Sequence, residues 1–208
     1  MEESLSKSKS KPLKWFKPGK IINVNNRMQK NYSYELTFDP GKNLTHGGWN
    51  EYGALIKHPD FKPKYSPQKM LHMGVFSGKY CNDQIFEFPR EWYLDDSGLF
   101  NSKKFSPEGA DPECNFFKIN SRQSLQEWRR KGWIPCVKGD KDSRGWFEWY
   151  CRYWLGRRHP DVDYVQIKRW KAFSRHYGQY KKNTKGKGND IHPKRRQALL
   201  QWSYPCKD

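Results

Sequence analysis

The periodicity of apolar and polar positions is clearest between residues 163 and 182. At about 100° per residue, apolar and amide side chains gather on one side of this segment and cations on another. The first side comprises Gln166, Trp170, Phe173, Tyr177 and Tyr180. The cationic side comprises Lys168, Lys171, Arg175 and Lys182. The pattern predicts an amphipathic helix over 163–182, with one face in the core and the cationic face in solvent.

Capping residues predict four further helices. Ser66, followed by Pro67, caps the first of them, and Gly74 ends it. The helix predicted over 144–155 has few polar positions, so we expect it to be buried on most sides. The predicted segments are 66–74, a helix capped by Asn120 or Ser121 that ends at Gly132, 144–155 with Gly156 after it, and a final helix opened by Pro193.

The first half of the chain has weaker patterns. Residues 32–38 alternate like a short strand. The expected class is therefore mainly α or α+β, with an irregular N-terminal half (21–119) packed on a C-terminal four-helix region (120–208). We expect one globular domain over 21–208. Before it lies a basic arm rich in Ser and Lys, residues 1–20, which we expect to be disordered.

Aromatic side chains are densest within residues 144–158, where six rings fall between positions 146 and 154 and four arginines run through and beyond them. Such rings stack on nucleobases, and guanidinium groups bind phosphates. A buried aromatic core has the same composition. Because three exposed Trp would promote aggregation, we expect most of these rings to be core. One or two of them, with Trp133 or Tyr177, could reach a ligand.

The net charge of +18 is concentrated at the two ends of the chain. Residues 1–20 hold six Lys and two Glu, for +4, and residues 21–120 hold 12 basic and 12 acidic side chains, for zero. Residues 121–208 hold 22 basic and 8 acidic side chains, for +14, together with seven of the ten Trp. Coincident charge and aromatic density favour nucleic acid over a membrane surface. We therefore expect a nucleic-acid-binding protein, with DNA ahead of RNA.

The candidate phosphate contacts are the arginines of the aromatic block, the cationic helix face, the Gly-rich linker and the start of the last helix. They are Arg144, Arg152, Arg157, Arg158, Lys168, Lys171, Arg175, Lys181, Lys182, Lys185, Lys187, Lys194, Arg195 and Arg196. Cations in line on a helix suit the phosphates of a groove, and Asp163 is the only acid on this predicted helix. The alternatives are a solvated helix face and a linker that contacts no ligand.

A second hypothesis is an enzyme acting on nucleic acid, either of the base-flipping glycosylase type or a nuclease. Carboxylates with a histidine can bind Mg²⁺ for phosphodiester cleavage, and an aromatic pocket can hold a flipped base. The candidate catalytic residues are His159, Asp161, Asp163 and His176. Alternatively, Asp161 or Asp163 simply caps the following helix. A third hypothesis is an interaction protein that binds an acidic partner protein.

The sequence carries no deaminase, P-loop or dinucleotide signature, so we expect neither a cofactor nor a metal. Its five cysteines form no CxxC pair, which favours free thiols in a reducing compartment. The first residues lack the apolar core of a signal peptide, and no apolar run is long enough to cross a bilayer. We expect an intracellular protein with no membrane partner. No pattern indicates the oligomeric state.

Several longer motifs share one resemblance. They are Met70–Tyr80 (MLHMGVFSGKY) with Glu87–Trp92 (EFPREW), Gln123–Ile134 (QSLQEWRRKGWI), Arg144–Arg158 (RGWFEWYCRYWLGRR) and Arg195–Trp202 (RRQALLQW). Over about residues 60–204, the chain resembles a family of hypothetical proteins from cyanobacterial phages, large algal viruses and some algae. The family has no established activity. The resemblance implies an intracellular setting near viral or host DNA, in the host cytoplasm or nucleus, and transfers no catalytic residue.

Overall fold

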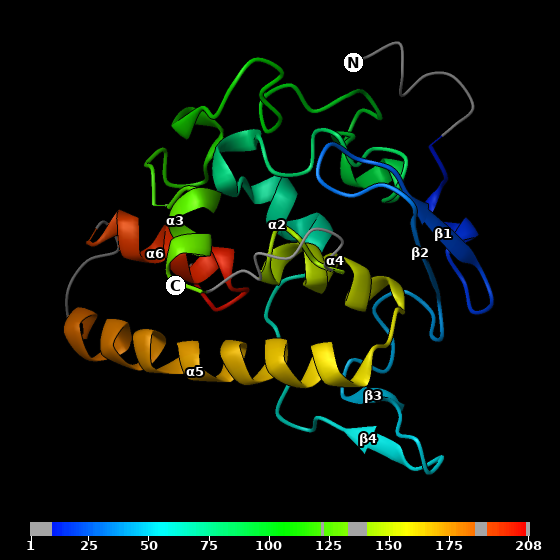
Figure 1. Cartoon of the computed structure of the whole chain (residues 1–208). Helices are drawn as coiled ribbons and strands as arrows, with labels where there is room; N and C mark the ends of the chain where they lie inside the picture. Colours follow the sequence, from blue (N-terminus) through cyan, green and yellow to red (C-terminus); the bar gives the residue numbers. More distant parts are fainter. Residues whose placement is uncertain (1–9, 122, 133–140, 186–190, 207–208) are drawn as a thin grey trace.

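The computed structural model describes residues 10–121, 123–132, 141–185 and 191–206. The α-helices of this part are α2 (Pro67–Met73), α3 (Leu125–Arg130), α4 (Trp146–Leu155), α5 (Pro160–Thr184) and α6 (Pro193–Gln201). Short 3₁₀ turns are η1 (Leu13–Trp15), η2 (Phe76–Gly78), η3 (Arg90–Trp92) and η4 (Pro112–Cys114). Two antiparallel hairpins pair β1 (Ile21–Val24) with β2 (Tyr32–Glu35) and β3 (His46–Trp49) with β4 (Leu55–Lys57). The predicted class, helices gathered in the C-terminal half with little sheet, is confirmed (Figure 1).

The helix caps confirm one boundary and correct others. The Ser66 hydroxyl accepts a hydrogen bond from the Lys69 amide at 3.2 Å, as expected for the N-cap of α2. The prediction that Asn120 or Ser121 caps α3 is wrong. Ser124 is the N-cap and accepts from the Glu127 amide at 3.1 Å, which is the Ser-x-x-Glu spacing of a capping box. The same helix ends before Lys131, one residue short of the expected glycine.

The longest helix, α5, lies along one side of the molecule, with α4 and α6 packed on its apolar face (Figure 1). It starts three residues earlier than the pattern predicts, because Pro160 occupies the first turn, where its missing N–H costs nothing. The predicted strand at 32–38 exists as β2, but β1, β3 and β4 were not predicted. Each of these strands has only three or four residues, too few for a periodic pattern, so the pairing partner defines them.

One continuous hydrophobic core joins the two halves of the chain, from Phe16 to Cys206. At its centre Phe61 makes ring contacts with four aromatic residues of α4 and α5 at centroid distances of 5.1–6.1 Å. The four described cysteines are buried, and none of them is in a disulfide. Phe16 is only 2% exposed, and the Leu13 amide donates to Glu91 at 2.8 Å. The expectation of a disordered arm is therefore wrong for residues 10–20, because the rings of Trp15 and Phe16 pack on the core. Residues 1–9 lie outside the described part.

A loop of the N-terminal half docks on the end of α4. Gly156 closes the helix at φ 116°, and its carbonyl accepts from the Thr37 and Phe38 amides at 2.9 and 3.3 Å. A side chain at this position would overlap the Phe38 carbonyl. The glycine is therefore required both by the backbone conformation and by the close approach of a second segment.

We expect Gly156→Ala to lower the free energy of unfolding by roughly 3 kcal/mol, through left-handed strain and overlap together. The matched control is Gly178→Ala in the exposed middle of α5, where nothing lies near the added methyl group. That change should raise stability by about 0.5–1 kcal/mol. Denaturant titration of both variants measures the difference. A Gly156→Ala protein as stable as the parent would show that this docking contact is not tight.

Candidate nucleic-acid interface

The predicted cationic face of α5 is present in the structure. Lys168, Arg175 and Lys182 are exposed, while Trp170 and Tyr180 on the opposite side are buried. Lys171 is also exposed but forms an ion pair with Asp60 at 2.9 Å. Across the described ranges no carboxylate pairs with the other three. The helix therefore presents three uncompensated positive charges in a row on one side.

Other predicted contacts extend this surface beyond α5. Lys181 is exposed, with its ammonium 4.6 Å from the centre of the Tyr177 ring. Lys185, Lys194 and Arg195 are exposed at the end of α5 and the start of α6. Lys187 lies outside the described residues. We call the exposed cations of α5 and α6 the basic surface; they are Lys168, Lys171, Arg175, Lys181, Lys182, Lys185, Lys194 and Arg195.

Three predicted phosphate contacts are buried instead. Arg144, Arg152 and Arg157 are 5%, 0% and 2% exposed. Arg157 forms a two-pronged pair with Asp142 at 2.7 and 2.9 Å, and Arg144 does the same with Asp83 at 2.7 Å for both bonds. Their assignment to phosphate is therefore corrected: these guanidinium groups already bind carboxylates inside the protein.

The carboxylates of this buried network come from both halves of the chain. The Arg152 guanidinium donates to Glu87 at 2.6 Å and to Asp142 at 3.1 Å, and it lies 3.5 Å from Glu148. Burial raises the pKa of Glu148, and the positive charge of Arg152 partly offsets this rise. Charges that are scattered along the sequence thus compensate each other in the core, where unpaired ions would be costly.

Arg158 and Arg196 also serve the fold. Arg158 donates to the carbonyls of His46 and Tyr153 at 2.7 and 2.6 Å, and its guanidinium lies 3.7 Å from the centre of the Tyr153 ring. Arg196 is buried and donates to the Cys206 carbonyl at 2.8 Å. Both were predicted to contact nucleic acid, and both instead fasten loops to helices.

The candidate catalytic residues do not converge on one centre. Asp163 is fully buried, where its two oxygens accept from Trp149 Nε1 at 2.8 Å and from the His159 amide at 2.7 Å. Asp161 is exposed, and His176 lies about 20 Å further along α5. Within the described ranges no three potential ligands could hold a metal ion. Neither aspartate is the N-cap, which is the His159 backbone without a side-chain cap bond.

Burial raises the pKa of Asp163 to about 7, against the opposing influence of Arg157. The same carboxyl titrates near 3.9 in an unfolded chain. The folded state therefore holds the proton more tightly, and the stabilisation is complete below about pH 4 and lost as pH rises to about 7. The loss amounts to roughly 1.4 kcal/mol per unit of pKa difference.

We expect Asp163→Asn to flatten the decline of unfolding free energy between about pH 4 and pH 7. The amide keeps an acceptor for the Trp149 indole but cannot titrate. Asp161→Asn, on the exposed first turn of the same helix, is the control and should leave the decline intact. Denaturant titrations across that pH range provide the measurement. A decline unchanged by Asp163→Asn would place its origin elsewhere.

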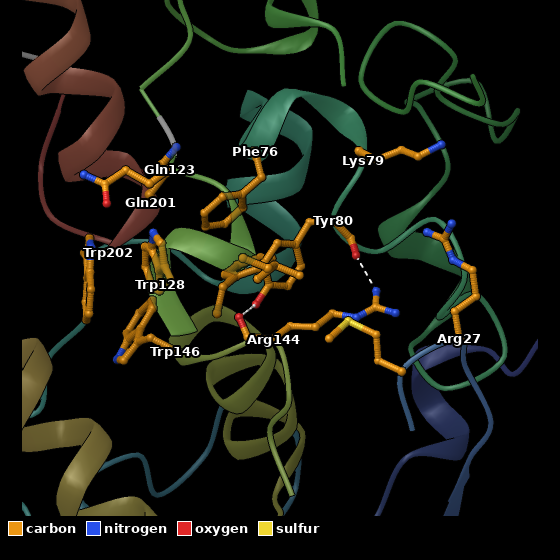
Figure 2. A pocket seen from close by; sticks show the side chains of 13 residues that line it. Arg27, Phe76, Lys79, Tyr80, Gln123, Trp128, Arg144, Trp146, Gln201 and Trp202 are labelled. Carbon is orange, nitrogen blue, oxygen red and sulfur yellow. Dashed lines mark hydrogen bonds between the residues drawn. The ribbon is translucent and has the colours of Figure 1, made fainter. Parts of the chain in front are cut away.

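A cavity of about 310 Å³ opens beside α3 and α4. Six rings line it: Phe76, Tyr80, Trp128, Trp146, Phe147 and Trp202. Its cations are Arg27, Lys79 and Arg144, and no described carboxylate lines it. Figure 2 shows three indoles together on one side, Arg27 and Lys79 on the other, and Tyr80 with Arg144 between them. We call this space the aromatic cavity.

A second cavity of about 340 Å³ adjoins the first and shares Gln123, Trp128, Gln201 and Trp202 with it. The Trp202 ring, which lies between them, stacks on Phe173 at 5.0 Å. Arg169 from α5 reaches this second cavity together with Arg175 and His176, again without a described acid in the lining. The two cavities thus lie side by side, one beside α4 and the other at the edge of α5, and we call the pair the groove.

Comparisons of the chain with protein-family models, with curated proteins and with solved structures find no match.

Sequence reasoning missed the residues that build the groove. For Arg169 the sequence offers one signal, since no acid lies three or four positions away on the helix. In the structure, burial lowers the pKa of its guanidinium. Lys79 and Gln201 carry none, because the fold alone brings these distant positions together. One or two rings of the block, with Trp133 or Tyr177, were predicted to reach a ligand, and this stays a prediction. Trp146 and Phe147 line the aromatic cavity, Tyr177 lines neither cavity, and Trp133 lies outside the described residues.

Proposed function

We propose that this protein binds nucleic acid through the basic surface of α5 and α6. The observation that supports the proposal most strongly is the unpaired line Lys168, Arg175 and Lys182 on a helix anchored by its opposite face. Successive members stand about 10 Å apart along the axis. That spacing is close to the screening length of physiological salt, so their fields add and attract a polyanion.

The ring-lined groove favours nucleic acid over other polyanions. Cations line both of its cavities: Arg27 and Lys79 line the aromatic cavity, and Arg169 and Arg175 line the second. Such a combination of stacking surfaces and cations is typical of strand binding. An acidic partner protein would need the cations but not the rings. The described helices include none that is long and apolar enough to span a membrane.

Binding, rather than catalysis, is the better supported activity. Among His159, Asp161, Asp163 and His176 no acidic side chain pairs with a histidine ring, and both oxygens of Asp163 are already engaged. We retain the preference for DNA over RNA as part of the proposal. The helix that carries the basic surface is compatible with either.

Fluorescence anisotropy with labelled single-stranded DNA, duplex DNA and RNA of equal length tests the proposal. We expect binding to all three that weakens steeply with added salt, with DNA bound more tightly than RNA. Binding that is absent, or that does not change with salt, would contradict nucleic-acid binding. A pulldown from nuclease-treated lysate dominated by one acidic protein would instead favour the interaction-protein hypothesis.

A further inference from the structure

We propose that the aromatic cavity holds one unstacked base of a bound strand, with its neighbouring phosphate at Lys79 and Arg27. The inference rests on the proposed function and specifies which form of nucleic acid the protein prefers. One end of the cavity is lined by rings and the other by cations, with Tyr80 and Arg144 between them (Figure 2). These two ends match the base and the phosphate of a nucleotide.

The volume suits a single base. At about 310 Å³ the aromatic cavity lies at the small end of the range for ligand sites, about 300–1,000 Å³. A base inside a duplex would first have to leave its stack to enter the cavity. Trp128, which is half-buried on α3, provides a ring that does not belong to the buried core. Strands with unpaired bases are therefore the expected ligand.

The cationic end carries a surplus of charge. The exposed Arg27 donates to Asp83 at 3.2 Å, and Arg144 pairs with the same carboxylate. Burial alone would raise the pKa of Asp83, but the hydrogen bonds from the two arginines hold it well below its ordinary value. Lys79 also lines this end, and Glu148 lies 3.9 Å from Arg144. The three cations therefore have two carboxylates near them, which leaves one positive charge. This surplus complements a phosphate.

Polar groups at the ring-lined end could recognise a base edge. The Gln201 side chain is 6% exposed, and its Nε2 has no hydrogen-bond partner among the described residues. The same residue lines both cavities. A buried donor without a partner costs free energy, which an acceptor on a bound base would recover. The amide offers a donor and an acceptor, so it suits any base rather than one.

The second cavity links this site to the basic surface. Arg169 is half-buried, and its nearest described acceptor is Gln166 at 3.4 Å. A guanidinium in that position, lining the same cavity as the exposed Arg175, can bind the next phosphate of a strand whose base occupies the aromatic cavity. A single strand can therefore follow the groove from Lys79 to α5.

A comparison of three ligands tests the inference in the full chain: a thymidine oligonucleotide, an abasic oligonucleotide of the same length, and a blunt duplex. We expect the thymidine strand to bind about tenfold more tightly than the abasic strand, because one stacked base is gained. Trp128→Ala should remove most of that difference and leave abasic binding unchanged. Lys79→Gln should weaken the binding of both strands. It should also make the salt dependence of that binding shallower, by about one released counterion.

The matched control is Trp49→Ala, which removes a half-exposed ring of β3 outside both cavities and should leave the difference intact. No residue of α3 is buried, so Trp128→Ala should fold. Equal affinity for the thymidine and abasic strands would overturn the base site while leaving the proposed function intact. Absence of salt-dependent binding to all three would overturn the proposed function, and the base site with it. Thymidine monophosphate bound as tightly as the strand would refute a strand ligand.

Discussion

Replacement of Arg152 by alanine is expected to lower the free energy of unfolding by about 3–5 kcal/mol, a large part of the stability of a typical domain. The side chain is completely buried and lies among Glu87, Asp142 and Glu148. Its removal would leave three carboxylates with too little positive charge and a cavity between them. The two halves of the chain meet at this point, so both should lose their contacts together.

Denaturant titration with intrinsic Trp fluorescence measures this loss, since the ten Trp report on the core. Arg130→Ala is the control, because Arg130 pairs with Glu127 at 2.7 Å but its side chain is 69% exposed. We expect that variant to lose little stability, because an exposed ion pair is screened by solvent. A similar small loss for Arg152→Ala would show that the buried network contributes little to stability.

Neutralising the three exposed cations of α5 that pair with no described carboxylate should lower affinity for nucleic acid roughly a hundredfold at moderate salt. The variant is Lys168→Gln, Arg175→Gln and Lys182→Gln together. All three side chains are exposed, so the fold should remain. Each lost cation removes one phosphate contact and the counterion release that accompanies it.

The control for this variant changes the net charge by the same amount elsewhere. Lys30, Lys42 and Lys103 are exposed in the first half of the chain, and their replacement by Gln lowers the charge by three. If net charge alone attracted the ligand, both triple variants would lose affinity equally. A loss confined to the α5 variant would locate the binding surface.

Local patterns predicted the parts of the fold that local chemistry determines. Ser66 with Pro67, and the alternation of rings and cations along α5, define helices whatever they pack against. The burial of Trp149 and Tyr153 likewise followed from the scarcity of polar positions around them. The β3–β4 hairpin was missed, because its register depends on a partner strand rather than on a periodic pattern.

The errors in the candidate site have one physical cause. An arginine contacts a phosphate or an internal carboxylate according to which acids the fold brings to it, and no local pattern contains that information. Arg152 pairs with Glu87, which lies 65 positions away. Lys168 and Arg175 were predicted correctly to be exposed, because the rings of their own helix determine which face is buried.

The positive excess of residues 121–208 therefore divides into cations paired inside the protein and cations exposed to solvent. Some of the excess in residues 121–208 compensates acids such as Asp83 and Glu87 of the neutral first half, across the core. Other cations of this region face solvent, among them those of the basic surface on α5 and α6. Because part of the excess is compensated inside the protein, the charge available to a polyanion is smaller than the sequence total suggests.

The salt dependence of duplex DNA binding tests most directly whether the basic surface contacts phosphate. For the parent protein, we expect the logarithm of the association constant to fall linearly with the logarithm of salt concentration. The α5 triple variant should have a slope shallower by about 3, since each phosphate contact adds about 0.9. Equal slopes for the parent and the variant would show that Lys168, Arg175 and Lys182 do not bind phosphate, and would contradict the proposed interface.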